Sequence, residues 1–345
     1  MCGGMSFKKK KNYLIEKQPL IYAVKNKSEQ TRASSTSGGI FTAASDYILD
    51  NNGVVYGVKF DEDFNVLHDK AFSKKERDKF RGSKYVQSYL GDIFSEIVDQ
   101  LQGDQKVLFS GTPCQVAGLL SFLTKKKINS ENLLTVDIVC HGVPSPMIWQ
   151  NHISKLLHKY SSFFDYNFRD KRVGWRGANV SIGIKNKGYQ INSPVLLSFV
   201  RLYFRSFITR PCCHKCQYTS INRHSDITIG DFWGIEKSMP EFDDNKGVSL
   251  VLVNSEKGNS FFQNISPCLI IKESNKTDCL QPQLQYPTKP SIRRSDFWRD
   301  YNKYGYDYIC RKYAGCSFIG YLKYNLKKVK ILKHVYHLLM GLKKK

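Results

Sequence analysis

Four of the ten cysteines occupy positions suited to holding a metal or a cluster. Cys114 and Cys140 each follow a predicted strand at a turn that contains glycine, and Cys213 and Cys216 form a C-x-x-C pair. Two thiolates at this spacing can hold one metal, and four suit either tetrahedral zinc or an iron–sulfur cluster. Cys212 is adjacent, but only Cys213 leaves two residues before Cys216. The spacing predicts a shared thiolate site and leaves its metal open.

The same cysteines allow two other interpretations. Free cysteine is commonly buried as a small apolar side chain, so core thiols at Cys114 and Cys140 with a chance C-x-x-C pair remain an alternative. Cys114 also lies where a helix is predicted to begin, which favours a nucleophilic thiolate with His141 as its base. Five further cysteines form no comparable pattern and are predicted to be ordinary thiols: Cys2, Cys268, Cys279, Cys310 and Cys316.

Two glycine-containing segments are candidates for binding phosphate. Ser37, Gly38 and Gly39 open a predicted helix, where backbone N–H groups and the helix dipole favour an anion. Residues 81–85 (Arg-Gly-Ser-Lys-Tyr) form a second small and basic turn. The alternatives are a plain helix cap for the first segment and a solvated charged loop for the second.

Alternating helices and strands are predicted to position these residues. Strands are predicted at 54–60, 106–109 and 133–139, with amphipathic helices between them. This alternation indicates an α/β fold with a mostly parallel sheet and flanking helices. Ligands bind beyond the carboxyl ends of such strands, where Cys114 and Cys140 are expected. Residues 163–195 change to short strands with turn signals, which indicates a β-hairpin insertion before the C-x-x-C pair.

The charge of the chain indicates an anionic partner. Lys and Arg number 53 against 30 Asp and Glu, a formal net charge of +23. Phosphate-bearing ligands, acidic lipid and nucleic acid all suit such a surface. Nucleic acid is not expected, because the lysines are scattered or gathered near the C-terminus without a reader motif.

No stretch approaches the ~18–20 apolar residues of a membrane span. No apolar run follows the basic N-terminus either, so a cytoplasmic protein is expected. Residues 318–345 read as a basic amphipathic helix, which predicts peripheral contact with the anionic inner face of a membrane. A helix packed on the domain with its lysines in solvent is the alternative.

Six segments, taken in order, resemble the beta subunits of coenzyme F420 hydrogenase and dehydrogenase, in the bacterial branch often encoded with polysaccharide-assembly genes. The segments are 37–41 (SGGIF), 81–85 (RGSKY), 111–115 (GTPCQ), 140–145 (CHGVPS), 213–216 (CHKC) and 226–234 (DITIGDFWG). The resemblance spans Leu20 to Trp298.

This resemblance implies a flavoprotein with FAD and one [4Fe-4S] cluster. The cluster ligands that it implies are Cys114, Cys140, Cys213 and Cys216. The residues that it implies for FAD contact are Ser37, Gly38, Gly39, Ser83, Lys84 and Tyr85. Asp226 and Asp231 are expected to order the cluster loop through hydrogen bonds, with strand-end turns as the alternative. No catalytic residue is singled out.

The chain departs from many bacterial relatives in lacking a ferredoxin-like module with two C-x-x-C-x-x-C runs, since only Cys2 precedes Leu20. A separate ferredoxin-like partner is therefore expected, and the substrate is expected to be an anionic small molecule or a sugar. The hypothesis is an iron–sulfur flavoprotein oxidoreductase in polysaccharide biosynthesis. The alternative is a zinc-stapled basic binding module without catalytic activity.

Four parts of the chain are predicted on this basis. They are a basic N-terminal segment (1–19), an N-terminal α/β flavin-binding part (20–160), a C-terminal part with the hairpin insertion and the C-x-x-C cluster loop (161–310), and a basic amphipathic helical tail (311–345).

Overall fold

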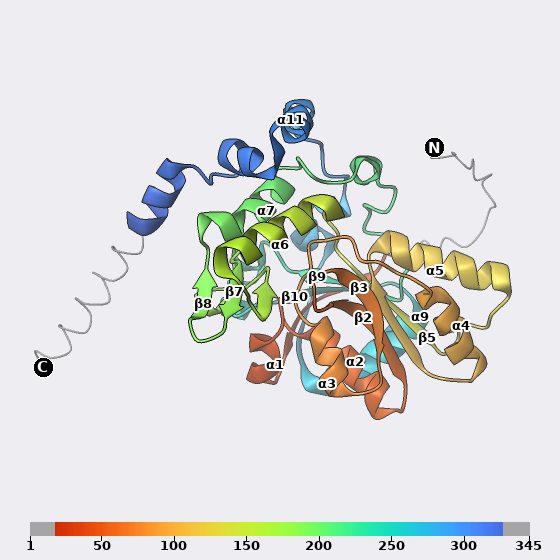
Figure 1. Cartoon of the computed structure of the whole chain (residues 1–345). Helices are drawn as coiled ribbons and strands as arrows, with labels where there is room; N and C mark the ends of the chain where they lie inside the picture. The colour runs from red at the N-terminus through yellow and green to blue at the C-terminus, as the bar shows by residue number, and fades with distance from the viewer. Residues whose placement is uncertain (1–17, 327–345) are drawn as a thin grey trace, which may run out of the picture.

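One eight-stranded sheet forms the centre of the protein (Figure 1). The computed structural model describes residues 18–326, so Cys2 and the greater parts of both terminal segments lie outside the described residues. The strand order is β11-β1-β10-β9-β5-β4-β2-β3. The bounds are β1 (Leu20–Asn26), β2 (Val54–Phe60), β3 (Val66–Ala71), β4 (Val107–Gly111), β5 (Leu133–Ile138), β9 (Ile227–Asp231), β10 (Ser249–Val253) and β11 (Leu269–Glu273).

The centre of the sheet is parallel, and its edges are antiparallel. Strands β2, β4, β5 and β9 pair in parallel, whereas β3 at one edge and β10, β1 and β11 at the other pair antiparallel. The α/β fold with flanking helices is therefore confirmed. Strands of this sheet come from both the predicted 20–160 part and the predicted 161–310 part.

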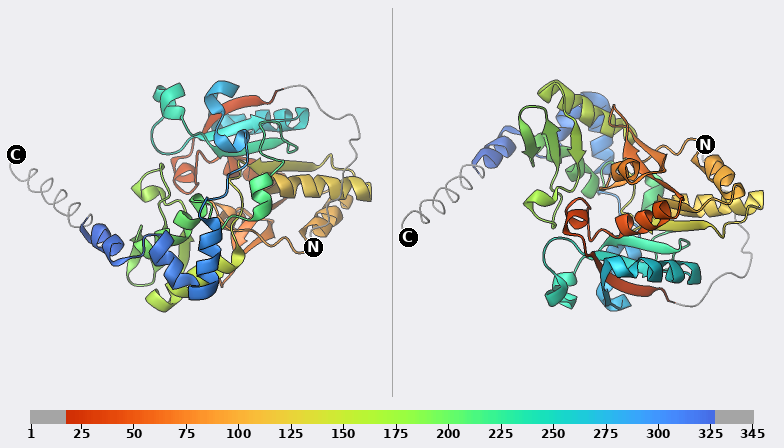
Figure 2. Two further views of the ribbon diagram at one scale, coloured as in Figure 1. Left: turned by 90° about the horizontal axis from the view of Figure 1, so that it is seen from above. Right: turned by 90° about the horizontal axis from the view of Figure 1, so that it is seen from below.

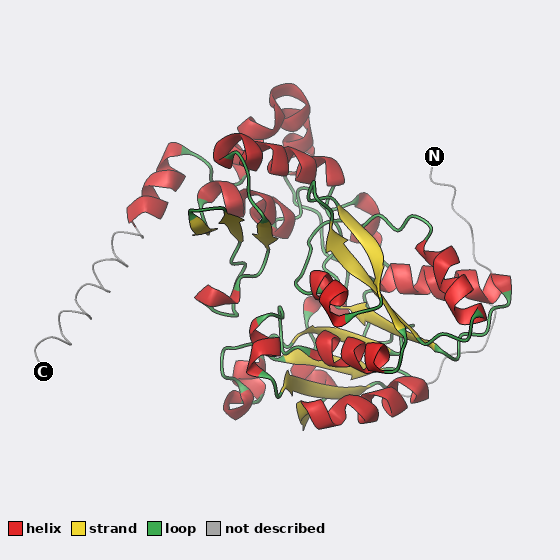
Figure 3. Cartoon of the chain, turned by 60° about the horizontal axis from the view of Figure 1, so that its bottom comes forward, coloured by secondary structure: helices red, strands yellow, loops and turns green. Residues whose placement is uncertain are grey.

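Helices cover both faces of the large sheet (Figure 3). They are α2 (Ile40–Asp50) and α9 (Glu256–Ile265) on one face, and α4 (Ile93–Gln102) and α5 (Pro113–Lys126) on the other. Successive residues of β4 point to opposite faces, so Leu108 packs with α2 and α9 while Val107 and Phe109 pack with α4 and α5. Burial on both faces explains why β4 reads as a continuous apolar run.

A second layer lies beside the large sheet, at the top of Figure 1. It contains a three-stranded antiparallel sheet of β6 (Asp165–Asn167), β7 (Ser181–Ile184) and β8 (Gly188–Ile191). Its helices are α6 (Pro146–Tyr160), α7 (Pro194–Phe204) and α11 (Arg294–Tyr313), which kinks at Gly305. The predicted hairpin insertion is therefore confirmed, with β6 as an additional strand.

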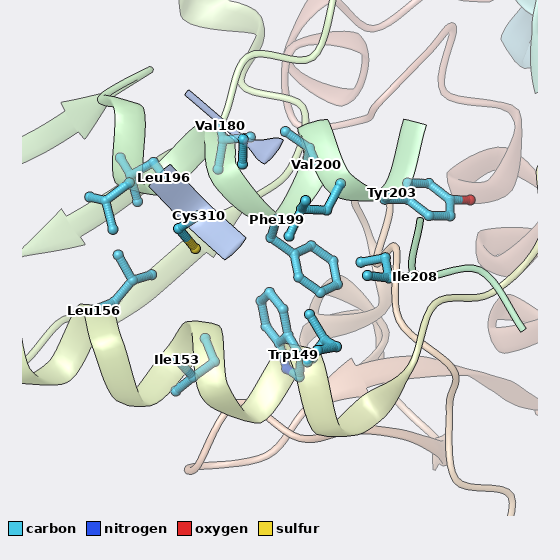
Figure 4. Close-up of a cluster of buried hydrophobic side chains, with 14 of the residues drawn as sticks. Trp149, Ile153, Leu156, Val180, Leu196, Phe199, Val200, Tyr203, Ile208 and Cys310 are labelled. Atoms are coloured by element: carbon cyan, nitrogen blue, oxygen red, sulfur yellow. The ribbon is translucent and has the colours of Figure 1, made fainter. Parts of the chain in front are cut away.

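Aromatic side chains hold this second layer together (Figure 4). The rings of Trp149 and Phe199 lie 5.0 Å apart, edge to face, between α6 and α7. His152 is fully buried, with one ring nitrogen 3.0 Å from the Tyr306 hydroxyl and the other 3.1 Å from the Tyr166 hydroxyl. Burial lowers the pKa of His152 to about 3, so this core histidine is neutral.

The shorter helices connect these layers. They are α1 (Glu29–Ala33), α3 (Lys74–Arg77), α8 (Ile235–Ser238) and α10 (Lys276–Cys279). Single 3₁₀ turns lie at Asp78–Phe80, Lys171–Val173, Pro211–Lys215, Pro240–Phe242, Ser266–Cys268 and Pro282–Leu284. Residues 318–326 are helical and lie at the periphery of the fold in both views of Figure 2. Within residues 18–326, no helix has the length and apolar character needed to cross a bilayer.

Gly38 is predicted to be required for stability. A Cβ at this position would lie 2.2 Å from the Val24 carbonyl oxygen and 2.7 Å from the Ser249 nitrogen. Because both are backbone atoms of strands, we expect Gly38→Ala to lower the free energy of unfolding by about 1–3 kcal/mol in urea denaturation. Gly103→Ala is the control, since its Cβ would meet no atom closer than 3.5 Å. Equal stability of the two variants would contradict the packing role of Gly38.

Candidate functional site

Three loops bring four cysteines together at one edge of the large sheet. Cys114 lies in the first turn of α5 after β4, and Cys140 follows β5, so the parallel pairing of these strands places both at the same end. Cys213 and Cys216 belong to the 3₁₀ turn at Pro211–Lys215 and its C-cap. Burial, with smaller contributions from the charges of the other three cysteines, raises the pKa of Cys140 to about 12. The predicted thiol group is thus one spatial cluster.

A capping box sets the position of Cys114. The Gln115 side-chain oxygen accepts from the Thr112 N–H at 2.9 Å, and the Gln115 amide donates to Ser88 Oγ at 2.9 Å. The Thr112 hydroxyl lies 3.2 Å from Cys114 Sγ. Helix α5 therefore begins in a fixed orientation, with the Cys114 thiol at its N-terminal end.

Gly142 lets the loop after β5 approach the C-x-x-C turn. Its N–H donates to Cys140 Sγ at 3.3 Å, and the Val143 N–H donates to Cys213 Sγ at 3.5 Å. Its φ is +109°, and a Cβ would lie 2.8 Å from the Thr209 methyl. Glycine is required here by both conformation and space. The two N–H groups point at the sulfurs, as a thiolate ligand needs.

The histidines beside the cysteines serve to hold these loops. His141 Nδ1 accepts from the Gln283 amide at 2.8 Å, and the Thr288 hydroxyl donates to the His141 carbonyl at 2.9 Å. His214 Nδ1 donates to the Thr288 carbonyl at 2.7 Å. The described structure forms no hydrogen bond between His141 and Cys114. The geometry therefore gives the nucleophile–base interpretation no support.

Arg223 makes this region suited to a negatively charged group. Its side chain is 2% exposed, and its Nε and one Nη have no hydrogen-bond partner among the described residues. The other Nη donates to the Tyr218 carbonyl at 3.0 Å and lies 3.9 Å from the Asp137 carboxylate. Burial raises the pKa of Cys216, whereas the Arg223 charge lowers it. A buried guanidinium with unpaired N–H groups is costly unless an anion lies nearby, so the site fits a thiolate-bound cluster.

The metal itself remains a prediction. The cysteines of the described chain are all free thiols. Residues 18–326 contain no group of three or more His, Cys, Asp or Glu side chains arranged to hold a single metal ion.

A cavity of about 390 Å³ joins the cysteine cluster to one of the predicted cofactor segments. Cys140 and His141, from the loop after β5, line one side of the cavity. Lys84 and Tyr85, from the 81–85 segment, also line it. Tyr203 also lines the cavity and donates to the Gly142 carbonyl at 2.7 Å, which ties the wall to the cysteine loop. One ligand in this cavity would touch both groups of residues.

Lys84 and Tyr85 give the cavity a half-buried base and an aromatic wall. The Lys84 ammonium donates to the carbonyl oxygens of residues 80, 81 and 82 at 3.4, 3.0 and 3.3 Å. Desolvation nevertheless lowers the pKa of Lys84 to about 7. The Tyr85 ring stacks on Tyr203 with centroids 5.4 Å apart. The result is an aromatic wall beside a lysine whose pKa desolvation lowers.

Arg169 organises the opposite part of the cavity, and sequence reasoning missed this residue. Its guanidinium donates to Asp231 at 3.0 Å, to the Tyr85 hydroxyl at 3.3 Å and to the Trp175 carbonyl at 2.9 Å. The Trp175 indole donates to Asp231 at 2.9 Å and stacks on Trp233, with 5.2 Å between centroids. The only sequence signal was a group of basic residues around Trp175, which by itself indicates a charged hairpin.

The two aspartates of the 226–234 segment have different positions. Asp231 ends β9 at the carboxyl edge of the sheet, where its carboxylate accepts from Arg169 and Trp175 and not from the cysteine loops, so the expectation that it orders the cluster loop is not supported. Asp226 precedes β9 at the amino edge, where its carboxylate accepts from the Thr135 N–H at 2.9 Å and the Ser255 hydroxyl at 2.7 Å. The expectation that Asp226 orders the cluster loop is therefore wrong, because β9 runs parallel to β5 and the cysteines lie at its other end.

A second cavity, of about 270 Å³, lies between residues 33–36, which precede the predicted Ser37–Gly39 segment, and Gly82 of the 81–85 segment; Ser37, Gly38 and Gly39 themselves do not line it. The Ser83 N–H donates to Thr36 Oγ1 at 2.9 Å, which joins the segments. Arg169 lines this cavity as well as the first, so the two cavities share a wall. Other residues lining the second cavity include Ser34, Ser35, Thr36, Gly82, Lys171 and Arg172.

Ser37 and Gly38 have hydrogen-bond partners within the protein. The Gly38 N–H donates to Ser249 Oγ at 2.9 Å, and the Ser37 hydroxyl donates to the Val248 carbonyl at 2.7 Å. Gly39 is the N-cap of α2, with φ +90°, and no side chain caps this helix. The first two residues therefore anchor the helix to the sheet, and their contact with FAD stays a prediction.

Lys84 is expected to make stability pH-dependent. The pKa of Lys84 falls from 10.5 to about 7 on folding, so the unfolded chain binds more protons between these values and stability rises with pH there. Lys84→Met removes this contribution. The free energy of unfolding of Lys84→Met, minus that of wild type, should therefore fall by up to about 1.4 kcal/mol per pH unit as pH rises from 7.

Urea denaturation of the protein without cofactors, at several pH values, measures this difference. Lys79→Met, at an exposed position, is the control for loss of a lysine. A difference between Lys84→Met and wild type that stays constant with pH would show that Lys84 titrates as an ordinary lysine.

A solved structure shares this fold. A structure entitled as a xenon derivative of the F420-reducing [NiFe] hydrogenase complex from Methanosarcina barkeri matches with a TM-score of 0.51 and 17% sequence identity. The match covers 84% of this chain and 88% of the other. At this identity the similarity establishes the fold alone. No curated protein matches the sequence.

The family is established by sequence. A family model that describes the C terminus of the coenzyme F420 hydrogenase/dehydrogenase beta subunit matches residues 104–278, half of the chain. The matched range includes all four clustered cysteines, Arg169 and Asp231. The resemblance found in the six ordered segments is thereby confirmed, and the chain belongs to the coenzyme F420 hydrogenase/dehydrogenase beta subunit family.

Proposed function

We propose that this redox subunit is an oxidoreductase that uses FAD and one [4Fe-4S] cluster. In this proposal it passes electrons between a reduced carrier or ferredoxin and an unknown, sugar-derived substrate of polysaccharide biosynthesis. The observation that carries the proposal is the shared cavity, in which Cys140 of the cysteine cluster faces the same space as Lys84 and Tyr85. A cofactor bound there would lie against the cluster, as electron transfer requires.

The four clustered cysteines would hold the iron–sulfur cluster. Cys114, Cys140, Cys213 and Cys216 would supply its thiolates, and the unpaired N–H groups of Arg223 would face its negative charge. The N–H groups of Gly142 and Val143 would donate to two of the sulfurs. Such hydrogen bonds and charges tune cluster potentials. The cluster would supply one-electron steps, and the flavin would supply two-electron hydride chemistry.

The chain's own residues would bind and orient the flavin. Tyr85 and Tyr203 would line the site of an aromatic ligand, and Arg169, fixed by Asp231, stands between the two cavities. The second cavity places hydroxyl and basic side chains next to the first, although Asp165 and Asp170 also line it and Asp170 pairs with Arg172. Lys171 and the hydroxyl groups would meet the phosphates of a ligand whose ring lies in the first cavity. A dinucleotide has this composition.

The expected partners follow from the same proposal. A ferredoxin-like protein would exchange electrons with the cluster. The positive charge of the chain suits an acidic electron partner and an anionic substrate. Such an enzyme would work in the cytoplasm, and at the inner face of the membrane if its substrate is a lipid-linked sugar.

Cofactor content tests the proposal directly. Protein purified anaerobically should contain FAD and close to four iron and four sulfide per chain. Single replacements by serine at Cys114, Cys140, Cys213 and Cys216 should each lower the iron content severalfold, because each removes one ligand. Cys268→Ser is the matched control, as this exposed thiol lies outside the cluster and should leave iron unchanged.

The same samples distinguish the competing assignments. Cys212→Ser should also keep its iron, because Cys213 is the predicted ligand. Colourless protein with stoichiometric zinc and no flavin would instead establish the zinc-stapled binding module. Unchanged iron in all four ligand variants would show that the cluster is held elsewhere.

A further inference from the structure

The helix formed by residues 318–326 contacts the rest of the protein through its tyrosines. Tyr321 packs against the aromatic core of the second layer, and the Tyr324 hydroxyl donates to the Ile191 carbonyl in β8 at 3.3 Å. The Lys159 ammonium in α6 lies 5.0 Å from the centre of the Tyr321 ring. These contacts fix which side of the helix faces the domain.

The opposite side of this helix is an exposed apolar stripe. It consists of Phe318, Ile319, Leu322 and Leu326, which are 83%, 60%, 48% and 55% exposed. At about 100° per residue the four side chains fall within roughly one quarter of the helix circumference, away from the two tyrosines. A helix on the surface of a protein in water normally turns its apolar side inward. In this helix the apolar side faces the solvent instead.

The sequence around the apolar stripe carries positive charge only. Residues 318–345 contain eight lysines and no aspartate or glutamate. Lys323 belongs to the described helix, and the other seven follow it along the chain. Two copies of this segment would repel each other, which disfavours a second copy as the occupant of the stripe. An apolar surface bordered by lysines instead matches an anionic lipid bilayer.

We propose that the apolar stripe docks on the anionic surface of a membrane. In this arrangement Phe318, Ile319, Leu322 and Leu326 insert at the level of the headgroups and Lys323 meets the lipid phosphates. The positive charge of the sequence that follows adds attraction to an anionic surface. The tyrosine contacts hold the domain at a set orientation to the bilayer. The cofactor site does not take part, so this proposal stands independently of the proposed redox activity.

Flotation of the full-length protein with lipid vesicles tests this proposal. The protein should float with vesicles of phosphatidylcholine that contain phosphatidylglycerol, and much less with pure phosphatidylcholine. High salt should weaken binding. Leu322→Gln/Leu326→Gln should lower the affinity about tenfold or more, because two apolar side chains leave the contact while glutamine keeps the helix propensity.

Asn325→Gln is the matched control, because it changes an exposed polar residue of the same helix. It should bind as wild type does, and all three proteins should have the same circular dichroism and melting temperature. Equal binding of the double variant and wild type would overturn the proposal, as would equal binding to both vesicle types. A wild-type oligomer that the double variant converts to monomer would show that the stripe is an interface between protein chains instead.

Discussion

The parallel pairing of β4 with β5 is the constraint on which the site depends. It places the ends of both strands at one edge, so that Cys114 and Cys140, which are far apart in sequence, emerge side by side. The second layer then supplies the C-x-x-C turn through α7, and Gly142 allows the close approach of the two loops. The cavity forms where the layers meet, which is why residues of both line it. A change in strand order would separate every element of the site.

The sequence predicted those parts of the structure that depend on local pattern. Apolar runs such as 106–109 read as strands, and the proline before Cys114 reads as a helix start. The four cysteines could be singled out because spacing and strand ends are visible in sequence. The Arg169–Asp231 pair could not, because 62 positions separate its members and only the folded chain shows that they meet. For the same reason Asp226 and Asp231 looked equivalent until the direction of β9 placed them at opposite edges.

Neither the Ser37-Gly38-Gly39 segment nor the net charge identified a ligand from the sequence alone. Ser37-Gly38-Gly39 is equally compatible with an anion cradle and with close packing, and the neighbouring backbone of Val24 and Ser249 accounts for Gly38 by packing. The net charge of +23 is not concentrated in the site, where Arg169 is paired with Asp231 and desolvation lowers the pKa of Lys84. Part of this positive charge lies in residues 318–345, the segment that begins with the exposed apolar stripe. The proposed site chemistry and the proposed surface attachment would thus be separate properties of one chain.

In the proposed electron transfer, a cluster held by Cys140 exchanges electrons with a flavin in the cavity that Cys140 lines. Photoreduction of the flavin in the anaerobic holoprotein, followed by freezing and electron paramagnetic resonance, tests this most directly. The account predicts that the signal of a reduced iron–sulfur cluster grows as the flavin absorbance bleaches. A flavin that becomes fully reduced while the iron–sulfur signal stays absent would contradict it.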